Sequence, residues 1–179
     1  MFKKIALGLG ALMLLFIVVV AFQPSEYRVS RTAILPAPPM EVFNRVNDFH
    51  QWDSWSPWAK LDPAVKNTFT GAASGTGAVF AWTGNSEVGE GRMTLTESRP
   101  GELVRIKLEF IRPFASVCDT DFTFKPEGQG TAVTWTMSGK NDFLGKAFCL
   151  FMNMDKTIGG DFERGFANLR TAVQAAPKP

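Results

Sequence analysis

Side chains that could carry out catalysis or bind a metal are few and scattered in this chain. There is one histidine, His50, and the two cysteines, Cys118 and Cys149, stand far apart. Zinc sites need three or four such ligands at short spacings, so a metal site is not supported. The chain also contains no G-x-S-x-G elbow and no glycine-rich phosphate loop. We therefore expect no metal and no cofactor, and His50 is expected to be a surface or capping residue.

Carboxylates remain the one route to acid–base catalysis, because burial in an apolar pocket raises their pKa. Strand alternation puts Glu109, Asp119 and Asp121 opposite the apolar residues of their strands, which predicts solvated carboxylates. Glu87 and Glu90 follow a predicted hairpin turn, and the pattern leaves their direction open. The sequence therefore names no catalytic residue and favours a protein that is not an enzyme.

Charge and cysteine content exclude further classes of protein. Lys3 and Lys4 precede the folded part, so 17 of the 19 basic residues face 17 acidic ones there. No basic excess remains to neutralise phosphates, and we expect no nucleic-acid partner. A disulfide between Cys118 and Cys149 is possible in an oxidising compartment, but two buried free thiols are the favoured interpretation.

Aromatic residues give the strongest sign of a binding function. Sixteen Phe and five Trp against one Tyr supply much apolar surface and few aromatic hydroxyls. Trp52, Trp55 and Trp58 recur every three residues, so on a helical turn they would share one side. Two interpretations stay open. The three indoles close one end of a core, or at least one of them lines the mouth of an apolar cavity.

The elements that would position these aromatic residues follow from two periodicities. Prolines at 36–39 begin a short helix, and a second helical turn covers residues 49–55. Helical spacing from Phe148 to Val173, interrupted at Gly159-Gly160, predicts a long C-terminal helix before a frayed end at residues 175–179. Alternating apolar residues predict seven strands, over residues 27–35, 65–70, 78–83, 87–98, 103–111, 115–125 and 131–138.

An unbroken apolar run over residues 5–22 follows Lys3 and Lys4. Eighteen residues at about 1.5 Å each reach about 27 Å, close to the hydrocarbon thickness of a bilayer. We interpret the run as an uncleaved membrane helix. A cleaved secretory signal is the alternative, because Val19-Val20-Ala21 loosely fits a cleavage site.

The expected topology follows from the charges that flank this run. The lysines should keep the N-terminus in the cytoplasm, although Arg28 and Arg31 on the other side oppose that orientation. We therefore expect a membrane anchor over residues 1–23 and one domain over residues 24–179. The protein would be a single-pass protein of the bacterial inner membrane, with its domain in the periplasm.

Several motifs resemble those of one known protein family. They are W-x-x-W-S-P-W at 52–58, G-x-G at 75–77 before a strand with Trp82, R-P-F at 112–114, G-T-A-V-T-W-T-M at 130–137, M-D-K at 154–156 and F-E-R-G at 162–165. Over residues 27–173 the chain resembles the polyketide cyclase/dehydrase-like branch of the START/Bet v 1 superfamily, the SRPBCC proteins. The resemblance implies an α+β helix-grip fold, in which a curved antiparallel sheet surrounds a long C-terminal helix and encloses an apolar pocket. Members bind lipids, sterols, polyketides or hormones, and a minority catalyse cyclisations.

We therefore expect a membrane-tethered binding module for a hydrophobic small molecule or lipid, held in an internal apolar cavity. A cyclase- or dehydratase-like enzyme acting on an apolar substrate is one alternative. The other is a ligand-free interaction domain of a membrane complex, with an exposed apolar patch. The expected cavity lining is Trp52, Trp55, Trp58, Phe80, Trp82, Leu95, Ile106, Leu108, Phe122, Phe124, Trp135, Met137, Phe162, Phe166 and Leu169.

Overall fold

The computed structural model describes residues 2–175, so residues 176–179 of the expected frayed end lie outside it. Helix α1 (Phe2–Ala21) precedes strand β1 (Glu26–Leu35), which is followed by helix α2 (Pro39–Asn47) and the short 3-10 helix η1 (Phe49–Ser54). The remaining elements are β2 (Lys66–Gly71), β3 (Ala78–Thr83), β4 (Glu90–Arg99), β5 (Leu103–Arg112), β6 (Ser116–Glu127), β7 (Gly130–Lys140), α3 (Phe143–Cys149) and α4 (Met154–Gln174).

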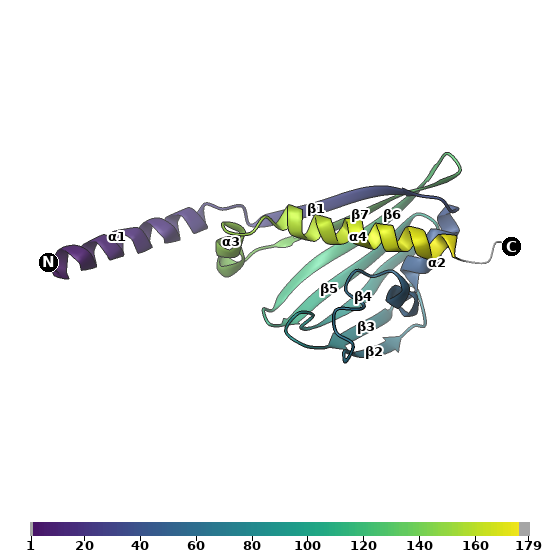
Figure 1. Cartoon of the computed structure of the whole chain (residues 1–179), viewed down its shortest axis with the longest axis horizontal. Helices are drawn as coiled ribbons and strands as arrows, with labels where there is room; N and C mark the ends of the chain where they lie inside the picture. The colour runs from purple at the N-terminus through teal and green to yellow at the C-terminus, as the bar shows by residue number, and fades with distance from the viewer. Residues whose placement is uncertain (1, 176–179) are drawn as a thin grey trace.

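The seven strands form one antiparallel sheet in the order β1-β7-β6-β5-β4-β3-β2. Strand β1 pairs with β7, although the two are distant in sequence. The sheet is curved, and α4 lies along β1 on its concave side (Figure 1). This arrangement confirms the predicted helix-grip fold and the seven predicted strands.

Alternation along each strand separates an apolar concave face from a charged convex face. On the convex face Arg92 lies opposite Glu109, 2.8 Å away. Arg105 bridges Glu97 at 2.8 Å and Asp121 at 2.9 Å across three strands. Exposed pairs of this kind contribute at most about 1 kcal/mol each, so burial of the concave face dominates the stability of the sheet. Its fully buried members include Leu95, Val104, Ile106, Phe122 and Val133.

Two predictions about the helical tail are wrong. Residues 143–149 form a separate helix, α3, and α4 runs without interruption through Gly159-Gly160. Gly159 instead leaves room for Arg31 on β1, because a Cβ there would run into the guanidinium. Arg31 donates to Asp155 Oδ1 and to Glu163 Oε1, each at 2.9 Å, and so fixes the first turns of α4 on the sheet. The hydrogen bonding of Arg31 to Asp155 lowers the pKa of the Asp155 carboxyl.

One predicted strand begins too early. Residues 87–89 were expected in β4, but they belong to the turn after β3. The Asn85 side chain accepts hydrogen bonds from the backbone N–H groups of Glu87 and Val88, which closes a local turn. Gly89 has a φ of 64°, a conformation that favours glycine, and the strand starts at Glu90.

Helix α1 is the one described helix that is long and apolar enough to cross a membrane, and its composition also fits a signal sequence. It extends away from the domain on the side of α3 (Figure 1). Its last turn packs on the domain, since Val20 is fully buried and Lys146 Nζ of α3 donates to the carbonyl of Ala21 at 3.4 Å. Only residues 22–25 separate α1 from β1.

Candidate functional site

The tryptophan-rich segment supplies core residues. Trp52 Nε1 donates to the carbonyl of Val46 at 2.9 Å, and Trp55 Nε1 donates to the carbonyl of Arg45 at 3.1 Å. Both indoles are therefore buried with their N–H groups satisfied by the end of α2. Trp58 lies beyond η1 and is only partly buried. This segment closes the end of the concave face that is far from α1.

Trp135 is at the centre of the packing between the sheet and α4. Its ring stacks on Phe162 with centroids 4.1 Å apart, and its centroid is 4.7 Å from that of Phe122. Gly165 allows this close approach, because a Cβ there would lie 2.7 Å from the indole. The Trp135 side chain is 1% exposed, and its Nε1 has no hydrogen-bond partner among residues 2–175.

Thr120 on the neighbouring strand is a second buried polar residue without a partner. It is 3% exposed, and its Oγ1 makes no hydrogen bond within the described part of the chain. Thr120 pairs with Met137, and Phe122 pairs with Trp135, so Thr120 and Trp135 are diagonal neighbours on the concave face. Each unsatisfied buried group costs about 1–3 kcal/mol, and native proteins hold few of them. A ligand oxygen could accept a hydrogen bond from either group.

The concave face is more open at the end nearest α1, which we call the α1 end. Trp82 lies opposite Gly91, and Gly91 lies opposite Phe110, so β3, β4 and β5 bring two aromatic residues together there. The indole covers Gly91 and donates from Nε1 to the carbonyl of Val88 at 2.9 Å. Phe80, Trp82 and Phe110 are partly exposed, whereas the residues further along the concave face are buried.

Tyr27 and Cys118 also lie at the α1 end, on either side of Gly139 in β7. Burial raises the pKa of the Cys118 thiol to about 11. Burial, with a contribution from Cys118, also raises the pKa of the Tyr27 hydroxyl above its usual range. Both groups therefore stay protonated at neutral pH, and Cys118 is not an activated nucleophile. Cys118 and Cys149 are free thiols, and Cys149 is only partly buried rather than buried as expected.

Most of the expected lining residues pack against one another in a single core. Partly buried positions are Trp58, Phe80 and Trp82. Ligand contact by these fifteen residues stays a prediction. The twelve buried members are Trp52, Trp55, Leu95, Ile106, Leu108, Phe122, Phe124, Trp135, Met137, Phe162, Phe166 and Leu169.

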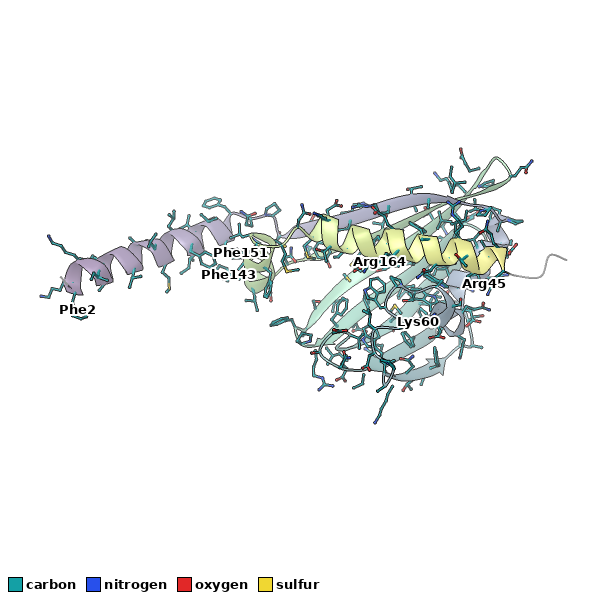
Figure 2. All side chains as sticks on the ribbon, viewed as in Figure 1. Phe2, Arg45, Lys60, Phe143, Phe151 and Arg164 are labelled. Atoms are coloured by element: carbon teal, nitrogen blue, oxygen red, sulfur yellow. The ribbon has the colours of Figure 1, made fainter. Side chains whose placement is uncertain are left out.

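Two surface hollows were not anticipated from the sequence. The larger, about 690 Å³, lies between η1 and the last turns of α4 and is lined in part by Arg45, Lys60 and Asn168 (Figure 2). The smaller, about 310 Å³, lies between β1 and α4 beside Arg31 and Arg170. Polar and apolar side chains line both, including Phe166 in the smaller, and neither is the expected internal apolar cavity. The sequence held one indication of the smaller hollow. Arg31 alternates in step with the apolar positions of β1, so its side chain lies on the inward face of the strand.

The side chains considered for catalysis lie away from the concave core. Glu109 and Asp121 are in convex ion pairs, and Glu90 pairs with Arg112 at 2.6 Å. His50 is on the surface, where it meets Asp48 at 2.9 Å. Within residues 2–175 no group of three His, Cys, Asp or Glu side chains is placed to hold a metal. The polar groups on the concave face are therefore hydroxyl, thiol and indole groups rather than an acid–base pair.

Comparisons with known proteins agree with this architecture. A family described as polyketide cyclase/dehydrase and lipid transport matches residues 26–174. Among curated proteins, none matches the chain in sequence.

Solved structures share the fold at low identity. Protein CV1439 from Chromobacterium violaceum is 17% identical with a TM-score of 0.59, over 86% of this chain and 100% of that one. Mll3558 from Rhizobium loti is 19% identical with a TM-score of 0.59, over 82% and 96%. Ara h 8.0201 is 13% identical with a TM-score of 0.57, over 84% and 99%. These identities establish the fold alone. The family match, however, spans nearly the whole domain, and the chain therefore belongs to the polyketide cyclase/dehydrase and lipid transport family within the SRPBCC superfamily.

Proposed function

We propose that this protein is a membrane-tethered binding module for a hydrophobic small molecule or lipid. The observation that carries the proposal is the pair of buried, unpartnered polar atoms, Thr120 Oγ1 and Trp135 Nε1, on a mostly apolar face. A mostly apolar ligand with one or two oxygens would satisfy them and bury its own surface. The description of the family, which includes lipid transport, supports a ligand of this class.

The ligand would bind at the α1 end of the concave face. The middle of the concave face is already filled by the stack of Trp135 on Phe162, and Trp52 and Trp55 close the far end. At the α1 end, Trp82 and Phe110 keep part of their rings exposed and lead inward toward Thr120. The binding surface we propose is therefore a subset of the residues expected from sequence, with Phe110 and Thr120 added.

The membrane tether in this proposal is α1. Residues 1–23 would remain as an uncleaved anchor, and the domain from residue 24 would lie in the periplasm of a bacterial cell. Lys3 and Lys4 on the cytoplasmic side support that orientation. Tethering raises the effective concentration of a membrane-derived ligand near the binding surface.

Binding of an NBD-labelled stearic acid to the full-length, detergent-solubilised protein tests the site. Thr120→Val keeps the volume of the side chain and removes its hydroxyl, so we expect the affinity to fall about two- to tenfold. Thr123→Val on the opposite face of the same strand is the matched control and should bind like the wild type. Extraction and mass spectrometry of molecules that co-purify with the wild type complete the test. No probe binding and no co-purifying apolar molecule would contradict the proposal.

A ligand-free interaction domain is the second candidate, because apolar side chains are exposed beside α1. It predicts that the wild type binds no NBD-stearic acid and that Thr120→Val changes nothing except stability. The same titration therefore separates the two candidates.

A further inference from the structure

We propose that α3 and the β5–β6 turn dock into the bilayer interface, so that the α1 end of the concave face exchanges lipid directly with the adjacent leaflet. This inference rests on the tether of the proposed function, and it adds the surface and the route of ligand entry. Its starting point is an apolar patch that the helix-grip core does not use.

The docking patch consists of Ile111, Phe114, Phe143, Leu144, Phe148 and Phe151. Phe151 is 80% exposed, Phe114 is 58% exposed and Phe143 is 50% exposed. The rings of Phe114 and Phe148 have centroids 5.7 Å apart, which joins the β5–β6 turn and α3 into one surface. Single exposed apolar residues are ordinary, but a contiguous group marks an interaction site.

Helix α3 contributes no buried residue to the domain. A helix of seven residues is not stable in water by itself, and most helices gain their stability from packing an apolar face. Its phenylalanine and leucine side chains therefore need an apolar environment that the described residues do not supply. A bilayer interface provides one, because an amphipathic segment buries its apolar side chains at the headgroup boundary.

The position of the docking patch beside α1 indicates that the bilayer covers it. The connection of four residues after α1 reaches at most about 14 Å. The backbone N–H of Asn141, just before α3, donates to the carbonyl of Ser25 in this connection at 2.7 Å. Figure 2 shows Phe143 and Phe151 at the junction between α1 and the domain. A spanning α1 therefore holds the patch against the surface from which it emerges.

The same placement explains how a lipid would reach the concave face. Phe110, on the rim of the α1 end, is two residues from the end of β5, and Phe114 of the docking patch is in the turn that follows. The rim and the docking patch are therefore at the same end of the sheet. A lipid leaving the leaflet at the patch would have a short path to the ring of Phe110.

Photocrosslinking of the full-length protein in nanodiscs tests the inference. The nanodiscs contain phosphatidylethanolamine, phosphatidylglycerol and a phospholipid with a diazirine on its acyl chain, and labelled peptides are mapped by mass spectrometry. We expect labels on α1 and on peptides of the docking patch, and none on the β6–β7 turn at the far end. Phe143→Ser with Phe151→Ser should lose the labels on α3. The matched control, Ile34→Ser with Met40→Ser, alters exposed apolar residues at the far end and should keep them.

The outcomes separate this inference from the proposed function. Labels on α1 alone would overturn the docking of α3 and leave the tether intact. An unlabelled α1 would overturn the tether and the docking together. Labels on α3 that persist in Phe143→Ser with Phe151→Ser would show contact without the specific role assigned to these rings, which also overturns the inference.

Discussion

At the residue scale, the ligand hypothesis predicts that removing the hydroxyl of Thr120 stabilises the ligand-free protein. Replacing an unsatisfied buried polar group by an apolar one of the same shape removes a desolvation penalty. We therefore expect Thr120→Val to raise the free energy of unfolding of the ligand-free protein by about 1 kcal/mol. Urea unfolding measures this change, and Thr123→Val on the convex face should stay close to the wild type. A destabilised Thr120→Val variant would mean that the hydroxyl has a partner in the free protein.

Cys118 provides a second residue-scale prediction. Its folded pKa of about 11 lies above the ordinary thiol value of 9.0, so the folded state keeps a proton that the unfolded chain releases. The contribution of this group to stability is complete below pH 9 and is lost as the pH rises toward 11. Cys118→Ala should flatten the decline in unfolding free energy over that window. Iodoacetamide at pH 8 should modify the partly exposed Cys149 well before Cys118.

At the element scale, adjacent glycines in α4 have different roles. A Cβ on Gly160 meets nothing within 4 Å, whereas one on Gly159 runs into Arg31. Gly160→Ala should therefore stabilise the protein by up to about 1 kcal/mol through helix propensity. Gly159→Ala should show a smaller gain or a loss, because Arg31 must leave Asp155 and Glu163. Thermal unfolding measures both variants, and Arg31→Ala should abolish the difference between them. Equal gains in the wild-type background would contradict the role of Gly159.

The elements show which parts of the molecule could be predicted from sequence. Period-two alternation identified every strand, because one face of each is buried and the other is charged. Gly159-Gly160 predicted a break in the helix that is absent, because the guanidinium that packs against Gly159 comes from β1, far away in sequence. Thr120 gave no signal, since threonine is an ordinary strand residue and its lack of a partner emerges only in three dimensions. Whether aromatic rings fill a space or line it depends on how closely α4 docks.

At the scale of the whole molecule, the two ends of the helix-grip domain differ in character. The far end is closed by Trp52 and Trp55, whose N–H groups are satisfied by α2. The α1 end keeps partly exposed aromatic rings and an apolar patch around α3, and the two unpartnered polar atoms are buried between the two ends. The open end of the domain is therefore the end that carries the apolar helix. This difference between the two ends places the proposed binding surface beside the proposed membrane contact.

The length of the connection between α1 and β1 is the feature on which that link depends. Twelve added glycine and serine residues after Gln23 would lengthen the four-residue connection fourfold, and effective concentration falls roughly as the −3/2 power of linker length. We therefore expect acyl-chain labelling of the docking patch in nanodiscs to fall about eightfold, with labelling of α1 unchanged. The same twelve residues inserted at Gly128 in the β6–β7 turn, at the far end, form the matched control and should leave both signals intact. Undiminished labelling of the patch with the long linker would show that α3 holds the bilayer by its own affinity. The short connection would then not set the distance between the binding surface and the leaflet.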